Sequence, residues 1–133
     1  MSYTRLIYAS RPFGYDNAML AGILLDARRC NSRDDITGAL IARGDLYLQL
    51  LEGPDAPVRD AFRRIARDDR HVDVQVLVTR RTDRRMFPGW SMRDDPAKSW
   101  MWSQREVAQG AVEKASEAEV EAVFTRLWRE ALH

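Results

Sequence analysis

The sequence predicts an α+β fold, in which one mixed sheet of four to five strands carries two helices on one face. Apolar runs of strand length alternate along the chain with segments of helical periodicity. The 133 residues are enough for one hydrophobic core and few for two ordinary domains. Lys and Arg number 21 against 20 for Asp and Glu, and 45% of the residues are hydrophobic, which argues against disorder and against a nucleic-acid surface.

The first two elements show two unlike patterns. Residues 5–10, RLIYAS, are apolar and β-prone, and a break containing Pro and Gly follows them, so a first strand is expected there. A helix is expected from Asn17 to about Asn31, and Asp16 or Asn17 can cap its start. Its apolar residues recur at three- and four-residue spacing: Met19, Leu20, Ile23, Leu24 and Ala27.

A hairpin and a second helix come next. Residues 36–42 and 46–51 are two strand-length runs, and the short link 43–45 favours an antiparallel hairpin. After a break at 52–54, helical spacing of apolar residues predicts a helix up to about Asp69. Alternation divides the side chains of the second strand between two faces, with Tyr47, Gln49 and Leu51 on one and Leu46, Leu48 and Leu50 on the other.

The last part of the sheet is less strongly marked. Residues 72–78 alternate as in a strand, and the segment Trp90–Met92 is expected to form a short final one. The element order is then βαββα followed by one or two strands. This order packs best as a ferredoxin-like sandwich, with both helices on one face of the sheet.

The chain changes character after residue 95, which divides it into an expected domain, 1–95, and a helical extension, 96–133. A tail helix is expected from Ser116 to Leu132, because Ser116 and Glu119 have the spacing of a capping box. Its apolar stripe needs a surface to cover, either the open face of the sheet or another subunit. The stripe consists of Val120, Val123, Phe124, Leu127, Trp128 and Ala131.

Three polar residues are candidates for a binding site. Gln49 is a neutral amide in the middle of an apolar strand, where burial without hydrogen bonds would cost about 1–3 kcal/mol per unmet group. Taken singly, Gln49 can face solvent, Tyr8 can be an ordinary core residue, and Asn31 can be a helix C-cap. Together, on two strands and at the end of a helix packed on them, these residues suit a planar heteroaromatic ligand.

Charged residues near the second helix extend the candidate site. Arg64 and Asp68 lie one turn apart, followed by Arg70 and His71, and this group can meet the polar tail of a ligand at the rim. The simpler interpretation is an i,i+4 ion pair between Arg64 and Asp68 on the surface. Arg28, close to Asn31 in the sequence, is a further candidate for contact with a cofactor.

Five segments, in this order and at these spacings, resemble the successive motifs of the BLUF (blue light using flavin) family. They are RLIYAS at 5–10, the exit from the first helix at 31–38, LQLLEGP at 48–54, Ile65 with DDRH at 68–71, and RMFPGWSM at 85–92. Any one of these strings is weak evidence, but five in register are strong. The resemblance covers residues 3–95 and implies a photoreceptor that binds a flavin without covalent attachment.

The resemblance also implies roles for single residues. Asn31 and Gln49 bond the flavin edge, with Tyr8 bonded to Gln49. In the family, light drives electron and proton transfer from this tyrosine to the flavin, and rearrangement of the glutamine amide then gives a small red shift of the flavin spectrum. Three further sets of positions match the family. Those that line the flavin ring are Ile23, Tyr47 and Ile65. Those that contact its polar tail are Arg64 and Asp68, and those of the signalling segment are Trp90 and Met92.

Two positions depart from the family pattern. Ala27 stands where the family often has Ser, and Cys30 where it often has Asn, so the polar edge of the flavin would receive fewer bonds. FAD is the expected cofactor, with FMN or riboflavin as further options. A flavin-free interaction or dimerisation module on the same fold is the main alternative. An RNA-binding module and a small acyl-phosphate hydrolase are disfavoured, because their aromatic and Gly-rich motifs are missing.

The sequence also bounds the setting of the protein. The lone Cys30, the lack of a signal-peptide pattern and the lack of an apolar run of membrane-spanning length favour the cytoplasm and argue against a membrane partner. No residues are spaced as metal ligands or as a familiar catalytic motif, so we expect a switch, not an enzyme. The signal would then leave through contacts of the tail helix, to a protein partner or within a homo-oligomer.

Overall fold

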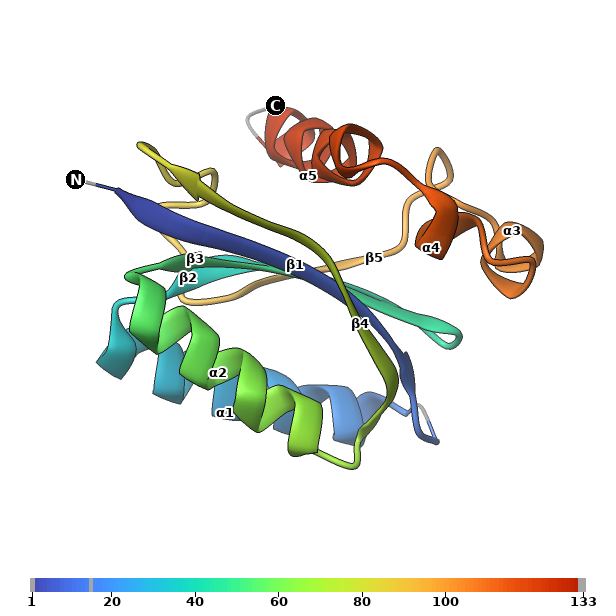
Figure 1. Ribbon diagram of the computed structural model, residues 1–133. Coiled ribbons are helices and arrows are strands. Elements are labelled where there is room, and N and C mark those ends of the chain that lie inside the picture. Colours follow the sequence, from blue (N-terminus) through green and yellow to red (C-terminus); the bar gives the residue numbers. More distant parts are fainter. Residues whose placement is uncertain (1, 15, 132–133) are drawn as a thin grey trace.

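The computed structural model describes residues 2–14 and 16–131, which form a mixed five-stranded sheet in the order β4-β1-β3-β2-β5 (Figure 1). The α+β, ferredoxin-like prediction is confirmed. The elements are β1 (Tyr3–Pro12), α1 (Asn17–Asp34), β2 (Thr37–Arg43), β3 (Leu46–Gly53), α2 (Asp55–Arg67), β4 (His71–Thr82), β5 (Arg93–Pro96), α3 (Gln104–Ala108), α4 (Ala111–Lys114) and α5 (Glu117–Ala131).

Strand pairing brings two candidate residues face to face. β1 pairs antiparallel with both β3 and β4, while β2 pairs antiparallel with β3 through the expected hairpin and parallel with β5. In the β1–β3 register Tyr8 stands directly opposite Gln49. Because directly opposed residues project to the same face of a sheet, both side chains point to the same side.

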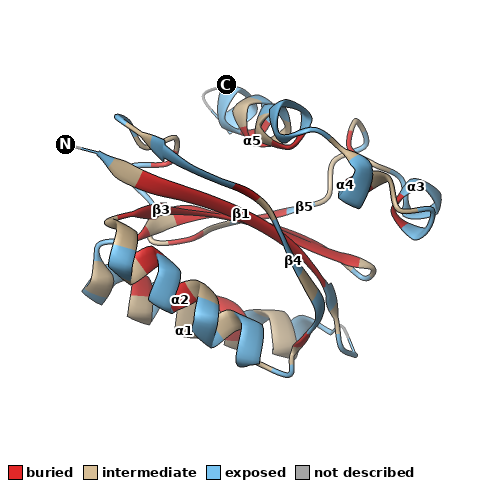
Figure 2. Cartoon of the chain, in the orientation of Figure 1, coloured by how far each residue is buried: buried red, intermediate tan, exposed pale blue. Residues whose placement is uncertain are grey.

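The two faces of the sheet are covered by different parts of the chain. Figure 1 shows α1 and α2 packed on one face and α5 on the other, and Figure 2 shows the buried strands between these layers. Tyr47 and Leu51 belong to the core cluster under α1 and α2, and Leu48 and Leu50 to the cluster under the tail helix α5. The predicted alternation along β3 is therefore confirmed.

The tail helix covers the second face of the sheet, which decides between the two surfaces that the sequence allowed. Val120, Phe124 and Leu127 are fully buried in one cluster with residues of the central strands. Ser116 and Glu119 form the expected capping box, with backbone-to-side-chain bonds of 3.0 and 3.1 Å. Leu132, the expected end of this helix, lies outside the described residues.

The first helix is longer than predicted, and this changes the place of Asn31. Helix α1 continues to Asp34, and Asp35 caps it in the left-handed conformation (φ 59°), its N–H bonded to the Asn31 carbonyl. Asn31 is therefore not the C-cap; it lies within the last turn with its side chain only 3% exposed. The start agrees with prediction, because the Asp16 side chain accepts the Met19 N–H at 2.6 Å.

The final strand begins later than predicted. The segment Trp90–Met92 is not a strand; β5 starts at Arg93. The carbonyl groups of residues 90–92 do not take part in a ladder, because three groups from α1 and β2 bond them, as described below. Strand β4 in turn continues beyond residue 78 to Thr82, because its basic end pairs with the start of β1.

Candidate functional site

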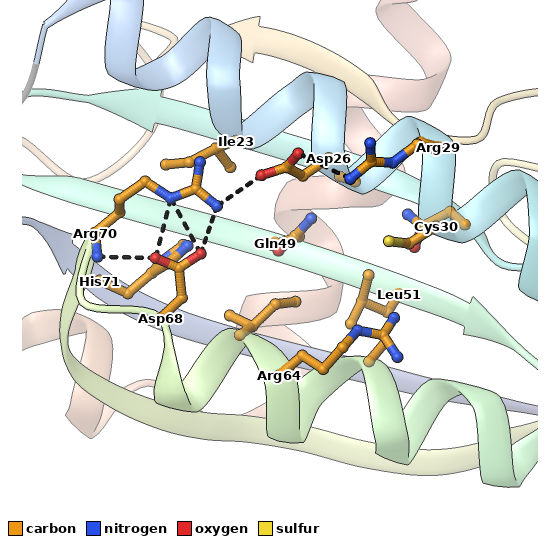
Figure 3. Close-up of a pocket in the computed structure, with 14 residues that line it drawn as sticks. Ile23, Asp26, Arg29, Cys30, Gln49, Leu51, Arg64, Asp68, Arg70 and His71 are labelled. Carbon is orange, nitrogen blue, oxygen red and sulfur yellow. Dashed lines mark hydrogen bonds and ion pairs between the residues drawn. The ribbon is translucent and has the colours of Figure 1, made fainter.

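A pocket lies between α1 and α2, with β3 as its floor (Figure 3). Its cavity measures about 260 Å³, close to the lower end of the roughly 300–1,000 Å³ of ordinary ligand pockets, so it suits a ring system better than a whole dinucleotide. Its lining is apolar at the walls and polar at floor and rim. The residues are Ile23, Asp26, Ala27, Arg29, Cys30, Asn31, Gln49, Leu51, Ala61, Arg64, Ile65, Asp68, Arg70 and His71.

The floor of the pocket is built around the amide of Gln49, which is 2% exposed. Its Oε1 accepts a short hydrogen bond from the Tyr8 hydroxyl, and its Nε2 faces the Met92 sulfur at 3.3 Å. A thioether is a weak acceptor, so the two N–H donors of this amide are only weakly satisfied. The amide is therefore held firmly at its oxygen and loosely at its nitrogen, and a ligand acceptor in the pocket would complete its bonding.

Tyr8 is fully buried beneath the pocket floor. Its ring centroid lies 5.6 Å from that of Phe62 on α2 and 6.0 Å from that of His71. Burial raises the pKa of Tyr8 well above its ordinary value of 10.0, and the charges of Asp68 and Tyr47 act in the same direction. Tyr8 therefore stays protonated near neutral pH and acts as the donor to Gln49.

His71 forms the wall of the pocket next to the two tyrosines. It is 8% exposed, its Nδ1 lies 2.8 Å from the Ser10 hydroxyl, and its ring packs 5.1 Å from that of Tyr47. Burial lowers the pKa of His71, Asp68 opposes this effect and Arg70 adds to it. The sequence placed His71 at the rim, whereas the structure places a neutral imidazole deeper, against the aromatic core.

The rim carries ion pairs that join α1 to the turn after α2. Arg70 bonds Asp68 and also reaches Asp26 on α1, with an Nη2–Oδ2 distance of 3.0 Å (Figure 3). The hydrogen bonds from Arg70 lower the pKa of Asp68, against the effect of burial. Arg64 pairs with Asp34 at 3.5 Å. The alternative i,i+4 pair between Arg64 and Asp68 is not formed, because α2 ends at Arg67 and Asp68 leaves the helical path.

The segment from residue 90 to 92 lies behind the pocket lining, where Met92 contacts Gln49, and each of its carbonyls is bonded. The Gly38 N–H donates to Trp90 O at 3.1 Å, Asn31 Nδ2 to Ser91 O at 2.8 Å, and Arg28 Nε to Met92 O at 3.1 Å. Met92 is 3% exposed, whereas Trp90 is 39% exposed. The segment thus sits against Gln49 on one side and is open to solvent on the other.

The sequence model of the BLUF family, described as sensors of blue-light using FAD, matches residues 3–93. The chain belongs to the BLUF family. The photoactivated adenylate cyclase subunit beta of Euglena gracilis is 33% identical over 90 residues, which cover 67% of this chain and 10% of that protein. The blue light- and temperature-regulated antirepressor BluF of Escherichia coli K12 is 40% identical over 52 residues, 39% of this chain and 13% of that protein.

A solved BLUF protein shares the whole layout. The dark-state structure of BlrB is 26% identical, has a TM-score of 0.80, and the match covers 97% of each chain. The chain spans only about a tenth of the length of the curated cyclase relatives it matches. The chain is thus similar over residues 3–93 to a family of blue-light sensors that use FAD, and the cyclase activity in the names of those relatives belongs to them alone.

Two observations indicate that the pocket of this BLUF chain fits a flavin ring. Two buried amides, Asn31 and Gln49, present hydrogen-bonding groups at one end of a cavity large enough for a ring system. The faces between which a planar ring would lie are apolar, with Ile23 on α1 and Ile65 on α2.

The structure gathers most of the predicted site residues and leaves a few apart. Tyr8, Tyr47 and Met92 lie behind the lining, while Arg28 and Trp90 lie away from it, Arg28 on the 90–92 segment and on Asp94. The residues that both prediction and lining contain are Ile23, Asn31, Gln49, Arg64, Ile65, Asp68, Arg70 and His71.

Sequence reasoning missed the pocket residue Asp26. The helical spacing could have indicated it, because positions 26, 27 and 30 lie on the same stripe as Ile23 and face the same side of α1. The polar character of Asp26 hid it, since only the apolar members of the stripe were counted. Ala61 and Leu51 were overlooked in the same way, as ordinary core positions.

Proposed function

We propose that Tyr8 and Gln49 are the photoactive pair of this blue-light sensor. The observation that carries the proposal is the hydrogen bond from the Tyr8 hydroxyl to Gln49 Oε1 at the floor of the pocket. Both side chains are buried, so the bond is shielded from water and has no competing solvent partner. A change at either residue would alter the bonding of the other.

The proposed cofactor is FAD, held mainly through its ring. When bound, the flavin would supply absorption of blue light and an excited state able to accept an electron. Asn31 and Gln49 would bond the ring edge, and Ile23 and Ile65 would cover its faces. Tyr47 would support the ring from behind His71, and Arg64 and Asp68, with Arg28 further out, would meet its polar tail; FMN and riboflavin share the same ring and suit the same contacts.

The residues of this chain divide the photochemical work between them. Tyr8 can release an electron together with its hydroxyl proton, and the proton lies on the bond to Gln49. The Gln49 amide can rotate or tautomerise, which exchanges a donor for an acceptor at the floor of the pocket. Either change breaks or remakes the contact between Gln49 Nε2 and the Met92 sulfur.

The signal would then pass along the segment that begins at Met86 and ends at Met92. At its start, the fully buried Glu52 accepts the Met86 and Phe87 N–H groups at 2.6 and 3.1 Å. The Phe87 ring packs 6.4 Å from that of Phe124 on α5. One segment therefore contacts the flavin pocket at one end and the tail helix at the other.

We propose that the output is a changed contact of Trp90 or of the tail helix, either with a protein partner or within a homo-oligomer. In the photoactivated cyclases the sensor belongs to a much longer protein. This domain itself would carry out no enzymatic reaction. In the described residues no helix is long and apolar enough to cross a membrane, and we propose the cytoplasm as its location.

The absorption spectrum tests this proposal. The protein is purified from bacteria and recorded in the dark, after blue illumination and after recovery. A flavin spectrum with a small, reversible red shift is expected. A colourless protein that also refuses added flavin would contradict the proposal and favour the flavin-free interaction module, for which Ala27 and Cys30 are the supporting residues.

A further inference from the structure

A chain of ion pairs runs along the mouth of the pocket, from α1 to the turn between α2 and β4 (Figure 3). Arg29 Nη2 lies 3.4 Å from Asp26 Oδ1, and Arg70 Nη2 lies 3.0 Å from Asp26 Oδ2. Arg70 also bonds Asp68. Of the two carboxylates that line the pocket, Asp26 and Asp68, Asp26 is therefore the one that pairs with two arginines.

The position of these pairs decides which part of a flavin would meet them. The cavity has room for the ring, so the ribityl tail has to leave through the mouth, past Asp26, Arg29 and Arg70. Riboflavin ends in a hydroxyl there, whereas FMN and FAD carry phosphate. Arginine is a preferred bidentate partner of phosphate, and a carboxylate in the same place repels it.

We propose that Asp26 sets how far this site distinguishes phosphorylated from unphosphorylated flavin. By pairing with Arg29 and Arg70, the Asp26 carboxylate competes with a flavin phosphate for both guanidinium groups and adds a negative charge beside them. Wild-type protein then selects its flavin by the ring and hardly by the phosphate. This inference rests on the proposed function, since it places a flavin ring in the pocket.

The degree of exposure limits the expected effect. The side chain of Asp26 is 47% exposed and that of Arg70 is 29% exposed, so solvent screens part of each interaction. Removal of the Asp26 charge should therefore change the preference between flavins by about fivefold, not by orders of magnitude. The change should shrink when salt is added, because salt screens partly exposed charges.

The test is a pair of titrations of flavin-free protein at low salt, one with riboflavin and one with FMN. Quenching of flavin fluorescence reports binding in both. Wild-type Kd values should agree within about threefold. In Asp26→Asn the ratio of the riboflavin Kd to the FMN Kd should rise about fivefold. Because each ratio is taken within one variant, a loss of stability that affects both flavins equally cancels.

Two control variants separate charge from other causes. Asp26→Glu keeps the carboxylate and should keep the wild-type ratio. Asp60→Asn removes an exposed pair with Arg63 (2.6 Å) on α2, away from the pocket lining, and should also keep it.

The outcomes distinguish this inference from the proposed function. An unchanged ratio in Asp26→Asn, with both flavins still bound, would overturn the role of Asp26 and leave flavin binding intact. A ratio that changes equally in Asp60→Asn would overturn it too, as a general charge effect. Failure of wild-type protein to bind either flavin would overturn the proposed function and this inference together.

Discussion

At the scale of single residues, the site depends on buried polar groups whose bonds are incompletely satisfied by the protein alone. Gln49 has a strong partner at its oxygen, Tyr8, and a weak one at its nitrogen, the Met92 sulfur. His71 is buried beside Tyr8, and its Nδ1 contacts the Ser10 hydroxyl. Such groups reduce stability unless a ligand or close packing compensates for their burial, which is typical of functional positions.

His71 should make the stability of the protein depend on pH. Burial lowers its pKa below the ordinary 6.5, so the folded state binds the proton less readily than the unfolded state. Its contribution is therefore fully present above about pH 6.5 and is lost as the pH falls below that value. The melting temperature should fall between about pH 7.5 and about pH 5.5, and His71→Gln should reduce that fall.

The sequence contains one other histidine, His133, and His133→Gln provides the matched control. It should keep the wild-type dependence on pH. If His71→Gln melts with the same dependence as wild type, the buried imidazole does not titrate with unfolding as argued.

Single-residue predictions from sequence succeeded where one strand decided the matter. The alternation of β3 was enough to put Gln49 and Tyr47 on one face. It could not show that Arg64 pairs with Asp34 on α1, because that partner comes from another helix. Contacts between elements depend on how helices pack, which periodicity within one element does not contain.

At the scale of elements, the 90–92 segment behind the pocket is bonded to the hairpin at a glycine. The Gly38 N–H donates to Trp90 O, and a Cβ on Gly38 would lie 1.9 Å from the Leu50 carbonyl oxygen. Backbone approaches of this kind leave no room for a side chain. Strand β2 therefore needs glycine at this position to pair closely with β3.

Gly38→Ala should destabilise the protein by about 1–3 kcal/mol, because the strands must separate to admit a methyl group. Gly44→Ala in the hairpin turn is the control, since nothing lies within 4 Å of its Cβ position. Urea unfolding monitored by tryptophan fluorescence gives both values. Equal stability of the two variants would show that β2 accommodates the side chain.

The tail helix provides a second element-scale prediction. Leu127 is fully buried against the sheet, so Leu127→Ala should cost about 2–5 kcal/mol. Trp128, the next residue, is 39% exposed, and Trp128→Ala should cost under about 1 kcal/mol. Thermal unfolding of the two variants is the measurement. A larger loss of stability in Trp128→Ala than in Leu127→Ala would contradict the packing of the Leu127 side of α5 on the sheet.

Most elements could be predicted, but their ends depended on tertiary contacts. Strand β4 reads as ending near Val78, yet it continues through Arg80 and Arg81 because β1 supplies a partner strand. The segment Trp90–Met92 reads as a strand, yet its carbonyls are bonded by Gly38, Asn31 and Arg28. In both cases the neighbour, and not the local pattern, decided the backbone conformation.

At the scale of the whole molecule, the sheet separates the face that carries the pocket from the face covered by the tail helix, which is the proposed output face. The flavin pocket lies under α1 and α2, and the tail helix covers the opposite side (Figure 1). A buried ion-pair network joins the layers, with Arg5 bonded to both Glu52 and Glu121 at 2.8 Å. This network ties β1 and β3 to α5.

We expect the protein to form a homo-oligomer through exposed aromatic residues of the output face. Trp128 on α5 is the candidate, since a large apolar side chain that is 39% exposed lies beside the buried stripe. Light scattering coupled to gel filtration should give at least twice the mass of the chain. Trp128→Ala should lower that mass, and a monomer in wild type would contradict the expectation.

The central claim is that the Gln49 amide converts light into a changed hydrogen-bond network, and the light-minus-dark difference spectrum of Gln49→Leu tests it most directly. Leucine has no donor or acceptor, so this variant should bind flavin and stay yellow but show no reversible red shift. Gln75→Leu, the same change at an exposed position of β4, should keep the normal shift. A normal red shift in Gln49→Leu would contradict the account.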